Sequence, residues 1–172
     1  MLPAIARLGP RLEKLAEMMM ECWSHKGKVL ICGNGGSACD AMHLSEELVA
    51  RFQKNRRGLA SIALCDPTVL TCAGNDFGYE TVFSRQVEAL GNAGDLLIVF
   101  TTSGNSPNIL LAIEKAKGQQ MGTAAFLGKD GGRAKGQCDV ELIVPARTSH
   151  RIQEGHQILY HTLCEWIDQR VD

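Results

Sequence analysis

The chain alternates short runs of apolar residues with longer stretches in which apolar residues recur every three or four positions. Runs of the first kind predict β-strands, and stretches of the second kind predict amphipathic α-helices. The predicted strands span residues 28–32, 59–64, 95–101, 122–128 and 140–145. The predicted helices span residues 10–24, 37–52, 107–118 and 150–172, and residues 65–90 are expected to form one or two helices broken at Gly74.

The predicted strands are almost continuously apolar, which is typical of strands that are buried under helices on both faces of a parallel sheet. The pattern therefore predicts an α/β fold, a three-layer α/β/α sandwich with a five-stranded, mostly parallel sheet. At 172 residues the chain has the length of one domain, so residues 1–172 are expected to form a single core. The N-terminal helix, about residues 10–25, is expected to pack on that core or on a neighbouring subunit.

Composition narrows the functional classes. The chain is 45% apolar and 22% charged with a net charge of −1, so it offers no basic surface for nucleic acid. The densest basic run, residues 53–58 (QKNRRG), is interpreted as a solvated loop. The N-terminal stretch has no unbroken apolar segment, so neither a signal peptide nor a membrane span is expected. Seven cysteines without a C-x-x-C pair favour reduced thiols, and we expect a cytoplasmic protein.

A glycine-rich loop follows the first predicted strand, at the strand end where ligands bind in parallel sheets. Residues 33–38 (GNGGSA) nearly match the G-x-G-x-x-A pattern of dinucleotide-binding units. The acidic residue that this fingerprint requires would be Asp66, which lies 33 residues beyond Gly33 and therefore comes too late. Dinucleotide binding is disfavoured.

A second polar loop, residues 101–108 (TTSGNSPN), follows the third predicted strand. Pro107 suits the first position of a helix, and Ser106 is therefore a natural N-cap. Hydroxyls and free backbone N–H groups at a helix N-terminus bind anions without any Lys or Arg. Ordinary capping would explain Ser106 but would leave Thr101, Thr102 and Ser103 without a role, so a phosphate pocket is favoured.

Metal-ligand residue types recur on two predicted helices. His43 and Glu47 are four residues apart and share one helix face, and such a pair suits Zn²⁺ or, more simply, a surface hydrogen bond. Gln153 and His161 lie on the last helix, eight residues apart, which corresponds to roughly 12 Å along the axis. His156 and Gln157 are competing candidates, and spacing alone does not choose between them.

These motifs together resemble a known family. The stretches CGNGGSACDAMHLSEEL, AGNDFGYETVFSRQVEAL, TTSGNSPN, GKDGG and RIQEGHQILYH occur in this order. In sequence and spacing they are similar to phosphoheptose isomerases, members of the sugar isomerase (SIS) domain family. The resemblance extends from Lys28 to Ile167 and implies a SIS domain of flavodoxin-like topology.

The resemblance also implies site residues. It implies one Zn²⁺ per active site held by His43, Glu47, Gln153 and His161, with Glu47 as general base and His161 as general acid. It implies a phosphate site made of Ser37, Thr101, Thr102, Ser103 and Ser106, and a sugar site made of Asn34, Arg51, Asp76 and Gln153. By spacing alone, Arg51 could instead pair with Glu47, and Asp76 could cap a helix or turn. A carboxylate that binds zinc is a poorer base, so the two roles of Glu47 compete.

Three positions differ from the family pattern. Thr101 replaces the usual Ser and keeps the hydroxyl, while His150 stands where the family often has Asp. Only 32 residues precede Gly33, so the leading helix is expected to be shortened or absent. The family forms homotetramers with active sites between subunits, and the resemblance implies the same assembly here.

The implied activity is an aldose–ketose isomerisation. Sedoheptulose 7-phosphate would become D-glycero-D-manno-heptose 7-phosphate through an enediol(ate) intermediate, for heptose and lipopolysaccharide precursors. This chemistry needs a base, an acid and a group that stabilises the enediolate, which a divalent ion can supply. Two alternatives stand beside it: a non-catalytic SIS protein that senses sugar phosphates or binds a replication initiator, and a SIS isomerase of another phosphosugar.

Overall fold

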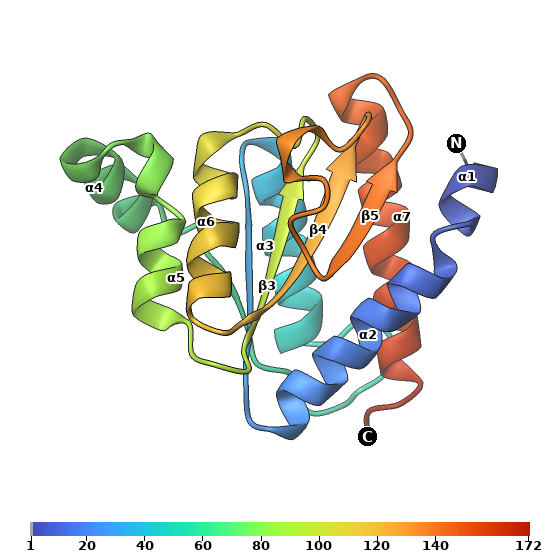
Figure 1. Ribbon diagram of the computed structural model, residues 1–172. Helices are drawn as coiled ribbons and strands as arrows, with labels where there is room; N and C mark the ends of the chain where they lie inside the picture. The colour runs from blue at the N-terminus through green and yellow to red at the C-terminus, as the bar shows by residue number, and fades with distance from the viewer. Residues whose placement is uncertain (1) are drawn as a thin grey trace.

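The computed structural model describes residues 2–172, which form a five-stranded sheet covered by helices on both faces (Figure 1). The strands are β1 (Val29–Gly33), β2 (Ser61–Ala63), β3 (Leu96–Thr101), β4 (Gly122–Gly128) and β5 (Val140–Val144). The α-helices are α1 (Leu2–Ala6), α2 (Gly9–Ser24), α3 (Gly36–Val49), α4 (Pro67–Phe77), α5 (Ser84–Leu90), α6 (Pro107–Gly118) and α7 (Ser149–Asp168). Short 3₁₀ turns, η1 (Tyr79–Thr81) and η2 (Gly132–Ala134), complete the assignment.

Every strand pairing in the sheet is parallel, and the strand order is β2-β1-β3-β4-β5. This order is that of flavodoxin-like folds, in which the chain reverses its direction of winding between β1 and β3. The predicted three-layer α/β/α sandwich is therefore confirmed, and the sheet is more regular than the expected mostly parallel one.

The two faces of the sheet bury two separate clusters of side chains. On one face, Ile31 and Phe100 pack with residues of α2, α3 and α7; on the other, Leu30 and Val99 pack with residues of α4, α5 and α6. Figure 1 shows α4, α5 and α6 together on one side of the sheet and α2 and α7 on the other. No helix within residues 2–172 is long and apolar enough to cross a membrane.

The expected helix break at Gly74 is wrong. Helix α4 runs through Gly74 to Phe77, and the chain turns instead at Gly78, where φ is +88°. A residue with a Cβ is strained at this φ, and the added atom would also lie 2.6 Å from Oε1 of Glu80. At Gly74 a Cβ would meet nothing closer than 3.7 Å, so the helix tolerates that position.

Three further features differ from the sequence-based expectations. The helix predicted over residues 37–52 ends at Val49, and α1 precedes the predicted N-terminal helix. The basic run at residues 53–58 is not wholly a solvated loop, because the Arg56 side chain is only 1% exposed and its Nε lies 2.8 Å from Oδ1 of Asp168. An arginine at this depth requires a charged partner, and the end of α7 supplies it.

Candidate active site

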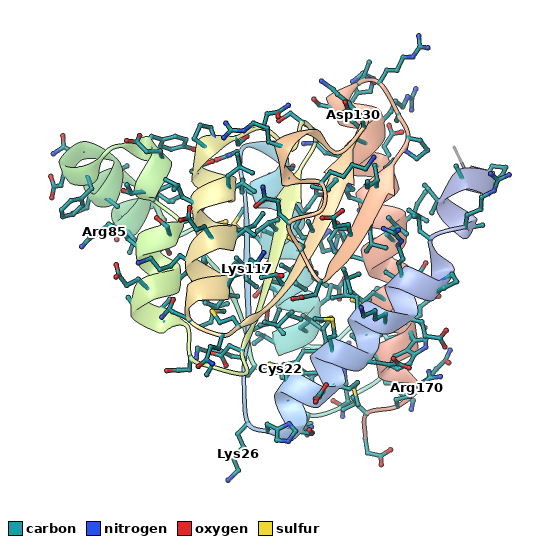
Figure 2. The ribbon with its side chains drawn as sticks, viewed as in Figure 1. Cys22, Lys26, Arg85, Lys117, Asp130 and Arg170 are labelled. Carbon is teal, nitrogen blue, oxygen red and sulfur yellow. The ribbon has the colours of Figure 1, made fainter. Side chains whose placement is uncertain are left out.

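The two polar loops meet at the carboxyl ends of β1 and β3, which are neighbours in the sheet. Gly33 at the end of β1 pairs with Phe100 near the end of β3, so the loops that follow these strands lie side by side. This is the crevice at which ligands bind in flavodoxin-like sheets. Figure 2 marks that end of the sheet by Asp130, in the loop after β4, and the opposite end by Lys26, just before β1.

A cavity of about 200 Å³ lies between these loops and the first turns of α7. It is lined by Asn34, Ser37, Phe100, Thr101, Thr102, Ser103, Ser106, Ser149 and Gln153. All five hydroxyl residues predicted to hold phosphate therefore line one pocket, together with two of the residues predicted to contact the sugar. The sequence reasoning missed Ser149, whose Oγ lies 3.2 Å from Oγ1 of Thr102.

Ser106 occupies the N-cap position of α6, and Pro107 begins the helix, as predicted. The Ser106 side chain, however, makes no capping hydrogen bond to any residue in the described part of the chain. Its hydroxyl is therefore free to bind an anion at the positive end of the α6 dipole, although Pro107 has no N–H and those of Ile109 and Leu110 donate to the carbonyl oxygen of Ser106. This geometry favours a phosphate pocket over simple helix capping.

Close backbone contacts at Gly104 fix the conformation of the loop formed by residues 101–108. Gly104 has φ +64°, and its N–H donates to Oγ1 of Thr101 over 3.1 Å. A Cβ on Gly104 would lie only 1.9 Å from the carbonyl oxygen of Gly131, in the loop after β4. The backbone thus fixes how the hydroxyls face the cavity, and only glycine fits there.

Asn34 is fixed by a side-chain network at the mouth of the pocket. Its Nδ2 donates to Oδ1 of Asn108 over 2.9 Å, and its Oδ1 accepts from Nδ2 of Asn108 and from the hydroxyl of Tyr79, at 2.9 and 3.0 Å. Asn108 is buried, so this reciprocal pair ties the first loop to the start of α6. Asn108 stands in the quoted TTSGNSPN stretch, but no local pattern indicates its partner.

His43, Glu47 and His161 form a cluster on the facing surfaces of α3 and α7. Their candidate ligand atoms all lie within 4.8 Å of one another, and Nε2 of His43 is 3.3 Å from Oε1 of Glu47. Nε2 of His161 is buried without a hydrogen-bond partner among the described residues. Two imidazoles and a carboxylate with one unsatisfied nitrogen fit a divalent cation such as Zn²⁺.

The ligand candidates that spacing left open have different surroundings in the structure. His156 is fully buried against the sheet, and its Nε2 lies 3.0 Å from the carbonyl oxygen of Leu127. Burial lowers the pKa of His156 to about 4. Gln157 is exposed, whereas Gln153 lines the cavity with the hydroxyl side chains and its amide packs directly on the backbone of Gly36. Ligation by Gln153 stays a prediction.

Burial also controls the charge states around the cluster. Desolvation, followed by the charge of His43, lowers the pKa of His161, which favours the neutral imidazole that a metal requires. Burial raises the pKa of Asp40, one turn before His43, to about 6. Oδ2 of this carboxylate has no hydrogen-bond partner within residues 2–172.

Two predicted sugar-binding residues lie outside the lining of the cavity. Arg51 follows the end of α3, is exposed, and forms no ion pair with Glu47 in the part of the chain described. The alternative of an ion pair between residues four apart on one helix is therefore wrong, because α3 ends at Val49. Asp76 lies near the end of α4 and accepts from Nδ2 of Asn75 over 2.7 Å.

Two other residues singled out in the sequence have local roles. Asp66 is the N-cap of α4, where its Oδ1 accepts from the backbone N–H groups of Thr68 and Val69 at 2.8 and 3.0 Å. This capping role accounts for the carboxylate that a dinucleotide site would have needed. His150 is exposed, and its Nε2 lies 3.3 Å from the hydroxyl of Thr148.

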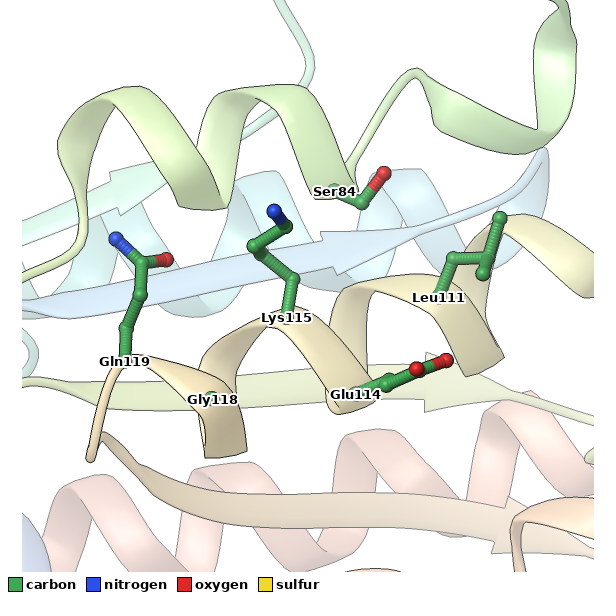
Figure 3. A pocket seen from close by; sticks show the side chains of 6 residues that line it. All are labelled: Ser84, Leu111, Glu114, Lys115, Gly118 and Gln119. Atoms are coloured by element: carbon green, nitrogen blue, oxygen red, sulfur yellow. The ribbon is translucent and has the colours of Figure 1, made fainter.

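A separate groove of about 370 Å³ runs between α5 and α6, on the sheet face opposite to the His/Glu cluster (Figure 3). In Figure 3, Lys115 and Gln119 rise from α6 toward α5, and Nζ of Lys115 is 3.1 Å from Oε1 of Glu88. The groove offers none of the predicted site residues, so the crevice at the carboxyl ends of β1 and β3 remains the candidate active site.

Comparison with known proteins agrees with this site. Residues 3–128 match the model of the SIS domain family. The chain is 50% identical over 157 residues to a phosphoheptose isomerase of Fusobacterium nucleatum, covering 91% of this chain and 81% of the relative. It is 51% identical over 160 residues to phosphoheptose isomerase 1 of Campylobacter jejuni, covering 92% and 86%.

Solved structures of phosphoheptose isomerases have the same fold as this chain. The chain superimposes on the phosphoheptose isomerase of Neisseria gonorrhoeae with a TM-score of 0.90 at 42% identity, covering 98% of this chain and 90% of the other. The phosphoheptose isomerase of Francisella tularensis gives a TM-score of 0.92 at 39% identity, covering 98% and 93%. Sequence, fold and site together establish that this chain belongs to the phosphoheptose isomerase family of SIS-domain proteins.

Proposed function

We propose that this chain is an aldose–ketose isomerase that converts sedoheptulose 7-phosphate to D-glycero-D-manno-heptose 7-phosphate, a precursor of heptose-containing glycans. One observation carries the proposal: a hydroxyl-lined anion pocket and a His/Glu/His cluster share α3 and α7 in a chain half identical to phosphoheptose isomerases. The substrate is a phosphorylated sugar, and the pocket and the cluster suit its two ends.

In this proposal the phosphate binds to the hydroxyls of Ser37, Thr101, Thr102, Ser103 and Ser106. Within residues 2–172 no Lys or Arg lines the cavity, so the anion would be stabilised by hydroxyl donors and by the N-terminus of α6. Asn34 and Gln153 line the same cavity and would contact the sugar chain nearest the phosphate. Arg51 and Asp76 would contact the sugar from outside the lining.

The ion is proposed to be Zn²⁺, held by His43, Glu47 and His161 with Gln153 as fourth ligand. The partnerless Nε2 of His161 and the close approach of the three ligand atoms support a cation at this position. When bound, the ion supplies Lewis-acid polarisation of the carbonyl and hydroxyl oxygens of the substrate.

Glu47 is proposed as the general base that removes the proton from carbon, and His161 as the general acid beside the substrate oxygens. The Glu47 side chain is 14% exposed, so its carboxylate is shielded from water yet reachable from the site. Because the pKa of His161 is lowered, its imidazole is neutral at rest and a strong proton donor once protonated. Sugar isomerisation needs such a proton to pass between two oxygens in each turnover.

We also propose a homo-oligomer, by family membership a tetramer. The three-residue cluster forms within one chain, so these three residues come together without a neighbouring subunit. Large apolar side chains are nevertheless exposed on α4, η1 and α5, namely Val69, Phe77, Tyr79 and Leu90. Burial of this surface by another copy would also enclose Asp76, which stands beside Phe77.

The test is turnover of sedoheptulose 7-phosphate by zinc-loaded protein, with a chelated sample beside it. We expect activity that disappears on chelation and returns with added zinc. The matched control is Gln157→Ala, one turn from Gln153 on the same helix but exposed, which should retain activity while Gln153→Ala should lose it. Absence of turnover in folded, zinc-replete protein would instead favour a non-catalytic phosphosugar-binding protein, and turnover of a different phosphosugar would change the substrate.

A further inference from the structure

Tyr160 connects the metal cluster to the core of the protein. Its side chain is 1% exposed, and its hydroxyl lies 2.9 Å from Nδ1 of His43. The ring stands on α7, whereas His43 stands on α3, so this hydrogen bond joins the two helices that carry the cluster. A buried phenol requires a partner, and His43 supplies it.

The Tyr160 ring is wedged between the sheet and the two histidines. It stands edge-on to Phe100 of β3, with ring centroids 6.0 Å apart at 88°, and edge-on to His161, at 4.8 Å and 88°. It meets His43 at 5.4 Å and 71°. These contacts hold the hydroxyl at a fixed point relative to the sheet, so it can act as a reference for the orientation of His43.

The two nitrogens of His43 consequently have different surroundings. Nδ1 faces the Tyr160 hydroxyl, while Nε2 faces Oε1 of Glu47 at 3.3 Å. A neutral imidazole carries one proton, and a nitrogen that binds a metal must be the unprotonated one. If Nε2 is the ligand, the proton is on Nδ1, and Nδ1–H donates a hydrogen bond to the Tyr160 oxygen.

We infer that Tyr160 is a positioning residue for the proposed metal site. Its hydroxyl orients His43 so that Nε2 faces Glu47 and His161, and the hydroxyl oxygen accepts a hydrogen bond from Nδ1–H when Nε2 binds the ion. A hydroxyl suits this task because it can accept from Nδ1–H in the metal-bound protein and donate to Nδ1 in the metal-free protein. Outer partners of this kind typically change metal affinity by roughly 10- to 100-fold. The inference rests on the proposed metal site.

The variant that tests it is Tyr160→Phe, which keeps the ring and removes only the hydroxyl. The chain contains one other tyrosine, Tyr79, whose hydroxyl is bonded to Asn34 at the pocket mouth, so Tyr79→Phe is a matched control. Zinc affinity is measured by competition with a chromophoric chelator, and thermal unfolding of the metal-free proteins reports their folding. We expect Tyr160→Phe to bind zinc at least about tenfold more weakly, and Tyr79→Phe to bind it like the original protein.

A second readout uses the unmutated protein and therefore does not depend on how the variant folds. In the zinc-loaded protein, imidazole ¹⁵N NMR should show zinc on Nε2 of His43 and a slowly exchanging proton on Nδ1. Zinc on Nδ1, or unchanged zinc affinity in a folded Tyr160→Phe protein, overturns the inference. Both measurements are made without substrate, so failure of the isomerase assay would refute the proposed reaction and leave this result intact.

Discussion

A buried ion pair joins the segment after α3 to the end of α7, the two helices that carry the His43/Glu47/His161 cluster, and breaking this pair should lower the free energy of unfolding. Asp168, near the end of α7, accepts from Nε of Arg56 at 2.8 Å and from the backbone N–H groups of Gln53 and Lys54, each at 2.9 Å. Arg56 also donates to the carbonyl oxygen of Glu47 at 2.8 Å. The ion pair therefore fixes the last turn of α3, from which the Glu47 carboxylate projects.

Arg56→Met removes the charge and keeps much of the apolar stem, leaving Asp168 buried with its two backbone donors. Removing one partner of a buried pair typically costs about 3–5 kcal/mol, because the other charge stays desolvated. The side chains of Arg56 and Asp168 are only 1% and 6% exposed, so we expect a loss of stability within this range of about 3–5 kcal/mol. The zinc affinity should also fall, because the end of α3 loses two hydrogen bonds from the guanidinium, at the carbonyl oxygens of Leu48 and Glu47.

Urea unfolding of Arg56→Met, Asp168→Asn and the double variant measures the coupling between the two side chains. We expect the double variant to be more stable than the sum of the single losses predicts, by more than about 1 kcal/mol. The pair should weaken in acid. Although burial raises the pKa of Asp168, the hydrogen bonds from Lys54 and Arg56 outweigh it and lower the pKa, so this stability is present at neutral pH and is lost as pH falls below about 4. Additive losses of the free energy of unfolding in the double variant would refute an interaction between Arg56 and Asp168.

Three further predictions concern the core, the phosphate loop and the metal cluster. Burial lowers the pKa of His156 to about 4, so the neutral imidazole stabilises the fold above about pH 6.5, and up to about 3 kcal/mol of the free energy of unfolding is lost as pH falls toward 4. In His156→Gln, urea unfolding measured at several pH values should lose this pH dependence. An unchanged pH dependence of the free energy of unfolding would contradict the prediction. Gly104→Ala should destabilise the fold by more than about 1 kcal/mol and raise the KM for the phosphosugar. The control is Gly94→Ala, which is also at positive φ but has open space around it and should leave the KM unchanged. Equal KM values for the two variants would refute the argument that close packing at Gly104 shapes the loop. His161→Ala should abolish tight zinc binding in a chelator titration without breaking a hydrogen bond of Nε2 within residues 2–172. Retained zinc affinity would exclude His161 as a ligand.

The sequence alone was sufficient to predict the fold class and the hydroxyl-rich loop of the candidate site. Apolar strand runs and helical periodicity predicted a three-layer α/β/α sandwich with a five-stranded sheet, and those runs are local signals that burial on both faces imposes on parallel strands. The N-cap role of Ser106 before Pro107 could also be predicted, because capping depends on residues that are neighbours in sequence. The break at Gly74 was misplaced, since glycine alone does not distinguish a tolerated helix position from one with positive φ.

The tertiary structure decided which polar residues meet. His43 and His161 are separated by most of the chain. Spacing left His156 open and the resemblance implied His161, and the packing of α3 against α7 places His161, rather than His156, in the cluster with His43 and Glu47. The same packing buries Arg56 and brings the Tyr160 hydroxyl to His43. Spacing along one helix fixes which face a residue occupies, but the partner on that face comes from a remote segment. Such long-range contacts leave no periodic trace in the sequence, because a single hydrogen bond or ion pair constrains two positions and not the pattern between them.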